Sequence, residues 1–363
     1  MRIVVLGGTG NFGARIVRAL RNDPAVELLV AGRRGASVPG AEKVKALVLD
    51  IAEMDLARRL RDLSPALVIH CVGPYQGQDY RVATAALDAG AHYVDLADGR
   101  EFVTQFAKEM NQKAVSAGRT AITGVSTLPA LSSAVVEELR QGLSSIESIE
   151  LIIAPGQRAP RGRATLEAVF SYLGSSFPVW RGGNWTRSWG WMDLRAIRLD
   201  IGPRFAAACD VPDLALFPSR FAGVQTVTFH AALEFRAQHL ALWGLAALRR
   251  SGLPLPVQRW AVALGDLADW FDSAAGYTGG MCVSVVGHRG HGDRIRRTWQ
   301  LTAPATDGPE IPCMPATLLA RRFARGETPA SGAFECMGFL RLSDFGPEFT
   351  QWSMATRTAE SRA

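Results

Sequence analysis

The fold of this chain is decided by the stretch Ile3-Val4-Val5-Leu6-Gly7-Gly8-Thr9-Gly10-Asn11-Phe12-Gly13, which continues into the segment Ala14 to Leu20. The four apolar residues predict a buried strand, the glycines predict a tight turn, and the last segment has the periodicity of a helix. A strand that passes through glycines into a helix is typical of a phosphate-binding unit, because free N–H groups at a helix N-terminus attract anions. The alternative is a turn that binds no ligand.

We interpret this turn as the site of a dinucleotide cofactor. Gly7 or Gly8 allows the turn, Gly10 lets a pyrophosphate approach the backbone, and Gly13 lets helix and strand pack closely. The residues expected to contact the cofactor here are Gly7, Gly8, Thr9, Gly10, Asn11, Phe12 and Gly13.

The residue type at the end of the second expected strand distinguishes NAD from NADP. An NAD enzyme has an Asp or Glu there, about twenty residues beyond the glycines. This chain has Gly32-Arg33-Arg34 there. A guanidinium binds a 2′-phosphate that a carboxylate would repel, so we predict NADP(H), with Arg33 as the first contact and Arg34 as the second. The alternative is a solvated arginine pair.

Short apolar runs alternate with helical patterns over the first third of the chain and predict a doubly wound parallel sheet of the Rossmann type. The expected strands are Ile3–Leu6, Leu28–Ala31, Ala46–Leu49, Leu67–Val72, Tyr93–Leu96 and Thr120–Ile122. The expected helices are Ala14–Leu20, Leu56–Leu63, Gln78–Ala89 and Glu101–Ala117. The fold class is therefore α/β in this part, with residues 1–127 as the NADP-binding domain.

The remainder, residues 128–313, predicts a second, α+β domain. Met281 to Thr302 alternates like a hairpin around the turn His288 to Asp293. Residues 314–363 follow as a C-terminal segment. It contains a helix over 316–324 with a proline before it and a glycine after it.

Composition narrows the function. The 363 residues are 48% hydrophobic, and the formal charge of +6 is dispersed rather than gathered into a basic run, so nucleic-acid binding is not indicated. Five separated cysteines, no secretory signal and no long apolar span indicate a cytoplasmic protein without an integral membrane segment.

Further cofactor contacts are expected where other strands end, because ligands of open parallel sheets bind at the carboxyl ends of the strands. Asp50 and Ile51 follow the third expected strand, where Asp50 is placed either to bond the adenine or to cap the next segment. Val72, Gly73, Pro74 and Tyr75 follow the fourth.

These motifs, together with Ala31-Gly32-Arg33 and His92-Tyr93-Val94-Asp95-Leu96, make the chain resemble the saccharopine dehydrogenase-like oxidoreductases. The resemblance implies a Rossmann domain and a mixed-sheet domain (residues 128–313) that is used for substrate and often for dimer contacts. It also implies a C-terminal segment (residues 314–363) that packs back towards the first domain, and it places residues 72–75 beside the ribose and nicotinamide. Tyr75 is then either a proton donor and the catalytic residue, or a ring that packs under the nicotinamide. Asp95 and Asp98 are expected to be solvated or to cap a turn, and the alternative is that they orient substrate or loop.

Two departures from the family bear on the substrate. Saccharopine reductases carry a His soon after the Pro-Tyr pair and an Asp-Pro-Gly turn that opens the second domain, but this chain has Gln76-Gly77-Gln78 and Gly124 to Pro129. An amino-diacid substrate is therefore not favoured. We expect hydride transfer between NADPH and a C=N or C=C bond of a small or medium substrate. An apolar substrate is one alternative. The alternative is a catalytically inactive NADP-binding sensor or interaction protein.

Features of the second domain have two readings each. Trp180, Trp185, Trp189 and Trp191 line a pocket, or pack the sheet or an interface. Leu240 to Leu248 and Val257 to Phe271 are apolar over more than one face, which is typical of buried, oligomeric or membrane-associated helices, and burial against the partner subunit of a homodimer is favoured. His288 and His291 predict a solvated turn rather than a metal site, and His230 and His239 predict packing residues.

Overall fold

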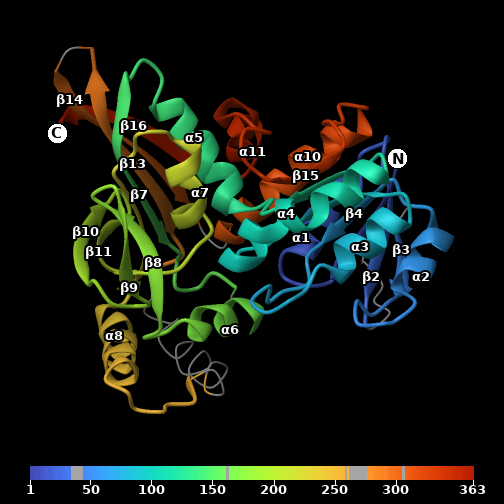
Figure 1. Ribbon diagram of the computed structural model, residues 1–363, viewed down its shortest axis with the longest axis horizontal. Coiled ribbons are helices and arrows are strands. Elements are labelled where there is room, and N and C mark those ends of the chain that lie inside the picture. Colours follow the sequence, from blue (N-terminus) through green and yellow to red (C-terminus); the bar gives the residue numbers. More distant parts are fainter. Residues whose placement is uncertain (34–43, 161–162, 258–259, 261–275, 291, 305–306) are drawn as a thin grey trace. The chain divides into compact units, whose positions relative to one another are not determined.

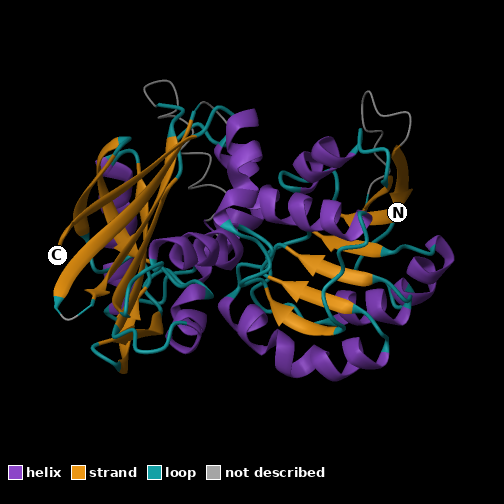
Figure 2. Cartoon of the chain, turned by 90° about the horizontal axis from the view of Figure 1, so that it is seen from above, coloured by secondary structure: helices purple, strands orange, loops and turns teal. Residues whose placement is uncertain are grey.

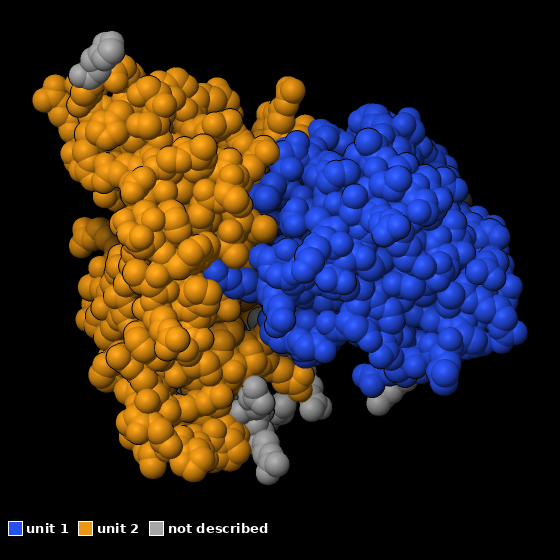
Figure 3. Space-filling view, viewed as in Figure 1, with its two compact units in different colours: residues 1–131, 309–340 blue, residues 132–308, 341–363 orange. Residues whose placement is uncertain are grey.

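The computed structural model describes residues 1–33, 44–160, 163–257, 260, 276–290, 292–304 and 307–363. The chain divides into two compact units, coloured separately in Figure 3. The first comprises Met1–Leu131 and Pro309–Leu340, and the second comprises Ser132–Gly308 and Arg341–Ala363.

The C-terminal segment is thus divided, whereas the family resemblance implies that all of residues 314–363 lie beside the first domain. Residues 341–363 fall in the second unit. The reason is a backbone ladder, because strand β16 (Ala355–Arg362) pairs antiparallel with β14 (Asp293–Ala303).

A seven-stranded sheet in the order β15-β6-β5-β4-β1-β2-β3 forms the first unit, and every neighbouring pair in it is parallel. Its strands are β1 (Arg2–Leu6), β2 (Glu27–Gly32), β3 (Val44–Val48), β4 (Leu67–His70), β5 (His92–Asp95), β6 (Thr120–Thr123) and β15 (Gly332–Glu335). Figure 2 shows these strands as arrows that run the same way between helices on both faces. The predicted doubly wound sheet is confirmed.

The helices of this unit pack their apolar stripes on the sheet, as the 3.6-residue periodicity predicts. They are α1 (Gly13–Leu20), α2 (Leu56–Leu63), α3 (Arg81–Asp88), α4 (Arg100–Ser116), η1 (Thr127–Leu131), η3 (Gly308–Cys313, of which Gly308 belongs to the second unit) and α10 (Met314–Ala324). Helix α1 packs against α10, and α2 packs against α3 (Figure 1). Helix α3 begins three residues later than expected, since the carboxylate of Asp79 accepts the N–H of Arg81 and Gln78 binds loop carbonyls.

Strand β15 was not expected. It joins the edge of the sheet beside β6, where Asn111 Oδ1 accepts the N–H of Ala333 and Thr120 Oγ1 donates to the carbonyl of Pro329. A four-residue strand that begins with Gly332 carries too short a pattern to be recognised, and its partner strand lies about two hundred residues earlier in the chain.

The second unit has a seven-stranded mixed sheet in the order β10-β11-β12-β7-β13-β14-β16, in which only β12 and β7 run parallel. Its remaining elements are β7 (Ser145–Ala154), β10 (Arg195–Leu199), β11 (Gly202–Ala208), β12 (Thr226–Leu233), β13 (Gly279–Arg289), the separate hairpin β8 (Ser176–Arg181) and β9 (Asn184–Trp189), and helices α5 (Ser132–Leu139), α6 (Arg163–Ser171), α7 (Asp213–Arg220), α8 (Arg236–Arg250), η4 (Leu342–Phe345) and α11 (Gly346–Gln351). The expected mixed sheet and the hairpin over 281–302 are confirmed.

The tryptophans of this unit are mainly packing residues. Trp180 donates its indole N–H to the carbonyl of Val224 at 2.8 Å and meets Trp185 edge to face, with ring centroids 5.2 Å apart. Trp191 is 2% exposed. These contacts favour the packing interpretation over a pocket lined by indoles.

Two leucines on helix α8 are exposed within the chain, Leu240 at 43% and Leu248 at 50%. Most of the second apolar segment, 257–271, lies outside the described residues, as does His291. His288 lies 3.8 Å from the carboxylate of Glu147, and His230 and His239 are buried. No helix within the described ranges is both long and apolar enough to cross a membrane.

Candidate cofactor site

The glycine-rich loop joins β1 to α1 at the carboxyl edge of the parallel sheet. Gly7 has φ of +74°, a left-handed conformation that side chains rarely adopt, and its N–H donates to the carbonyl of Ala31 at 2.8 Å. A Cβ on Gly13 would lie 2.2 Å from the carbonyl oxygen of Gly7, so the helix can approach the turn only without a side chain there. The loop geometry therefore explains the first and last glycines through the protein itself.

The loop is open where a ligand is expected. Thr9 and Gly10 are exposed, and a Cβ on Gly10 would meet only the Gly7 carbonyl, at 3.2 Å. No side chain of the described residues caps helix α1. Phe12 and Gly13 donate their N–H groups to no backbone carbonyl in the described ranges. A helix N-terminus whose first N–H groups bind neither a side-chain cap nor a backbone carbonyl in the described ranges fits a bound anion.

The end of β2 lies against this loop. Ala31 accepts the N–H of Gly7, and two residues later Arg33 is exposed at the end of the strand. The structure therefore brings Arg33 to the same edge as the glycines. Arg34 lies outside the described residues.

Asp50 and Ile51 follow β3, two strands away from β1 in the sheet. The Asp50 carboxylate accepts the N–H of Ala52 at 3.1 Å, and Glu53 closes the same turn by accepting the N–H of Asp50. Asp50 thus caps the turn after β3, one of the two roles that the sequence left open. Ile51 is half-buried in this turn.

Residues 72–75 form a loop after β4, which ends two residues earlier than expected, at His70. Val72 lies beside the glycine-rich loop, since a Cβ on Gly7 would come within 2.8 Å of Val72 Cγ2. Gln78 holds the loop by donating to the carbonyls of Val72, at 2.9 Å, and Pro74, at 2.6 Å. Two candidate segments that are far apart in the sequence therefore adjoin.

Tyr75 points inward. It is 5% exposed, its hydroxyl donates to the carbonyl of His70 at 2.7 Å, and its ring meets the rings of His70 and Phe102. Burial, reinforced by the negative charge of Asp95, raises the pKa of Tyr75 well above its usual value. This environment favours the packing role over proton donation.

Asp95 is fully buried at the end of β5 and organises the neighbouring loops. Its Oδ1 accepts the N–H groups of Ala97 at 3.0 Å and Gly124 at 2.9 Å, and the hydroxyl of Thr123 at 2.9 Å. Burial raises the pKa of Asp95 to about 6, although these donors oppose the shift. Asp98 is exposed and accepts a bond from Gln76 at 3.4 Å. Asp95 therefore ties β5 to β6.

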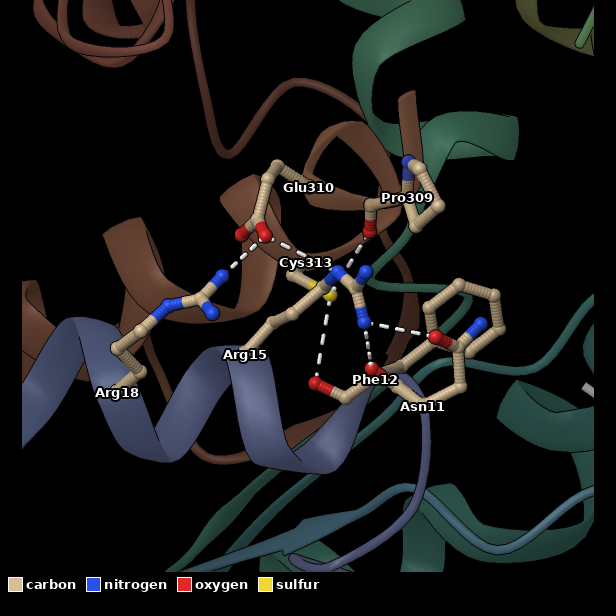
Figure 4. A network of polar contacts seen from close by, with 7 residues as sticks. All are labelled: Asn11, Phe12, Arg15, Arg18, Pro309, Glu310 and Cys313. Atoms are coloured by element: carbon tan, nitrogen blue, oxygen red, sulfur yellow. Dashed lines mark hydrogen bonds and ion pairs between the residues drawn. The ribbon is translucent and has the colours of Figure 1, made fainter. Parts of the chain in front are cut away.

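Sequence reasoning missed two groups of residues at this edge. His70 and Tyr93 are buried and joined by a 3.0 Å contact between His70 Nδ1 and the Tyr93 hydroxyl, and burial lowers the pKa of His70 to about 3. The available signal was a polar side chain at the end of an apolar run. The other group, Arg15, Glu310 and Cys313, lies behind the glycine-rich loop (Figure 4) and joins segments too distant for any local pattern to connect.

No group of three or more His, Cys, Asp or Glu side chains that suits a metal ion occurs in the described part of the chain. The donors gathered at the glycine-rich loop are backbone N–H groups and the guanidinium of Arg33, and both kinds of donor suit an organic anion.

Comparisons with known proteins agree with this geometry. Residues 3–122 match the family described as the saccharopine dehydrogenase NADP binding domain. A probable mitochondrial saccharopine dehydrogenase-like oxidoreductase of Arabidopsis thaliana is 27% identical over an alignment of 148 residues, and the match covers 35% of this chain and 32% of that protein. The match thus spans about a third of the relative's length.

Solved structures extend the likeness to the whole chain. Apo saccharopine dehydrogenase (L-Glu forming) from Saccharomyces cerevisiae superposes with a TM-score of 0.70 at 13% identity, covering 99% of each chain. Homospermidine synthase from Legionella pneumophila in complex with NAD gives a TM-score of 0.60 at 12% identity, covering 100% of this chain and 91% of that one. At such identities the likeness shows the fold.

The expected resemblance is therefore confirmed: residues 3–122 match the saccharopine dehydrogenase NADP binding domain, and the chain as a whole has the saccharopine dehydrogenase fold.

Proposed function

We propose that this chain is an NADP(H)-dependent oxidoreductase that transfers hydride between NADPH and a C=N or C=C bond of a small or medium substrate. The observation that carries the proposal is the glycine-rich loop. Helix α1 begins there at Gly13 without a side-chain cap, and Arg33 is exposed at the end of the neighbouring strand β2. The family to which residues 3–122 belong is described as NADP-binding, which supports the same reading.

In this proposal the pyrophosphate accepts hydrogen bonds from the N–H groups at the start of α1, which the helix dipole makes favourable. Arg33 binds the 2′-phosphate of the adenosine half, and no carboxylate occupies the position at the end of β2 that would select NAD. Arg34 is the second contact to the 2′-phosphate, and Asp50 and Ile51 lie on the adenine side of the cofactor.

The loop Val72–Tyr75 is proposed to line the nicotinamide side, since it adjoins Gly7 at the carboxyl edge of the sheet. The bound cofactor supplies the hydride chemistry. Tyr75 contributes by fixing the loop through its bond to the His70 carbonyl, and the role of a proton donor is the weaker alternative for it. A homodimer and a cytoplasmic location stay predictions, the former favoured by the exposed leucines of α8.

The test is calorimetric titration with NADPH and NADH of the wild type and of Arg33→Ala. Charge-assisted hydrogen bonds contribute about 1.5–3 kcal/mol, so the NADPH over NADH preference should fall about tenfold to a hundredfold in the variant. Lys108→Ala, which removes an exposed cation from the middle of helix α4, is the control and should leave the ratio unchanged.

Turnover separates the enzyme from the rival sensor. NADPH oxidation is measured with a panel of imines, ketones and enoyl compounds. Oxidation with an imine or an enoyl compound supports the proposal. Tight NADPH binding without turnover of any class supports a sensor, and the absence of heat with either nucleotide rejects both.

A further inference from the structure

The glycine-rich loop is held from behind by residues near the C-terminal end of the chain, as Figure 4 shows. Arg15, in the first turn of α1, forms an ion pair with Glu310, with 3.0 Å between Nε and Oε1. The same guanidinium donates through Nη1 to the carbonyl oxygen of Asn11 at 2.6 Å and to its side-chain Oδ1 at 2.7 Å. Arg15 therefore links the buried carboxylate to the backbone of the loop.

A second contact reaches the next carbonyl. The Cys313 sulfur lies 3.4 Å from the carbonyl oxygens of both Phe12 and Pro309, which share its single S–H donor. Phe12 O also accepts the helical N–H groups of Arg15 and Ile16, each at 3.1 Å. The two carbonyls that precede α1 are thus both held on the side of the C-terminal segment.

Fixing these carbonyls also fixes the donors of the site. In a trans peptide the carbonyl of one residue and the N–H of the next point in opposite directions. Holding the Asn11 carbonyl therefore directs the N–H of Phe12 away from Arg15, and holding the Phe12 carbonyl directs the N–H of Gly13 out of the helix. These are the N–H groups that bind no backbone carbonyl in the described ranges.

We propose that Arg15 and Glu310 are positioning residues for the dinucleotide: Glu310 orients the Arg15 guanidinium, and Arg15 holds the Asn11 carbonyl so that the loop presents its N–H groups to a pyrophosphate. The inference rests on the proposed function and deepens it. The site is then complete only with the segment Pro309–Leu340, which the chain returns to the first unit after forming most of the second.

The charge of Glu310 and its positioning role predict opposite effects of Glu310→Gln on NADPH affinity. The side chain is 7% exposed, and a carboxylate near an anion site disfavours binding of a polyanion, so its removal would tighten NADPH binding if charge were its only influence. Positioning predicts that Glu310→Gln weakens NADPH binding, because the Arg15 guanidinium loses the partner that orients it. The sign of the change therefore separates the two effects.

The experiment measures the Kd of NADPH and of adenosine 2′-phosphate for the full-length wild type and three variants by calorimetric titration. Arg15→Lys keeps the charge but cannot contact both Asn11 and Glu310 through a planar fork, and should weaken NADPH about tenfold. Glu310→Gln should weaken it about fivefold to tenfold. Arg18→Met is the matched control, because Arg18 also pairs with Glu310 but is 49% exposed, and should change the affinity less than about twofold.

Adenosine 2′-phosphate lacks the pyrophosphate and should bind all four proteins within about twofold, a result that general loss of structure would not produce. Wild-type NADPH affinity in Arg15→Lys, tighter binding in Glu310→Gln, or equal weakening of both ligands overturns the inference. If Glu310→Gln does not fold, the Kd values of NADPH and of adenosine 2′-phosphate for Arg15→Lys test the inference. Failure of the proposed function is recognised separately, since the wild type itself then binds neither NADPH nor NADH.

Discussion

Two regions of the same sheet edge are built on opposite principles. At the glycine-rich loop, between β1 and α1, four of the seven residues are glycines, and the N–H groups of Phe12 and Gly13 donate to no backbone carbonyl in the described ranges. At the ends of β4, β5 and β6, side chains that carry chemistry in other proteins, namely His70, Tyr75, Tyr93 and Asp95, are buried and bonded to one another or to the backbone.

Ligand recognition and loop stabilisation are therefore assigned to different parts of this sheet edge: the first to the glycine-rich loop, and the second to the ends of β4, β5 and β6. The first region is shaped by sterics that do not depend on pH, because residues 7–13 include no titratable side chain. The second is shaped by buried titratable groups whose pKa values are moved by burial, and its polar atoms hold loops together. Changes in the two regions should therefore differ in size and in pH dependence.

The largest effect is expected at the helix entry. Gly13→Ala places a Cβ 2.2 Å from the Gly7 carbonyl and 2.8 Å from Gly8 Cα, so the backbone must shift. We expect a loss of about 3 kcal/mol or more in unfolding free energy, with NADPH binding weakened more than about a hundredfold, about 2.7 kcal/mol in binding free energy. Thermal melts and titration measure both.

Gly10→Ala is the matched control for that experiment, because its Cβ would meet only one carbonyl, at 3.2 Å. It should melt near the wild type and still bind NADPH more weakly, because the methyl group occupies the approach of the ligand. A Gly13→Ala protein with wild-type melting and affinity would contradict the steric account.

The intermediate effect is expected at Asp95 and depends on pH. Burial raises its folded pKa to about 6, whereas an unfolded aspartate has a pKa of about 3.9. The folded state then binds the proton more tightly, so the stabilisation is present below about pH 4 and is lost as the pH rises to about 6. Relative to Asp95→Asn, the wild type should lose about 3 kcal/mol of unfolding free energy across that window.

Urea unfolding of both proteins at pH 4, 5, 6 and 7 measures this difference. The side-chain amide of the Asp95→Asn variant does not titrate, so only the wild type should show this component of the pH dependence. Parallel curves for the two proteins would show that the Asp95 carboxyl has a normal pKa. Thr123→Val, which removes one donor to Asp95 but keeps the carboxyl, should keep the slope.

The smallest effect is expected at Tyr75. Tyr75→Phe removes the 2.7 Å bond to the His70 carbonyl and should cost about 1–2 kcal/mol in unfolding free energy. If the ring only packs, kcat with a panel compound that is turned over should change less than about threefold. A fall of about a hundredfold at unchanged NADPH affinity would instead identify Tyr75 as the proton donor.

Local sequence patterns were sufficient to predict much of the secondary structure of the first unit. The strand-glycine-helix stretch from Ile3 to Leu20 predicted β1, the loop and α1 because turn chemistry and periodicity act over a few residues. The boundary of α2, Leu56–Leu63, was predicted to the residue. Strand β15 and the division of the C-terminal segment were not predicted, because both depend on pairing with strands far away in the sequence.

The sequence by itself determined that a parallel sheet would carry a glycine-rich turn with an arginine at the end of its second strand, since both are encoded within about thirty residues of one another. Only the tertiary structure decided that Tyr75 turns inward, that Asp95 is buried, and that Glu310 reaches the loop through Arg15. Burial and long-range ion pairs arise when distant segments exclude water together, and no local pattern records which segments will meet.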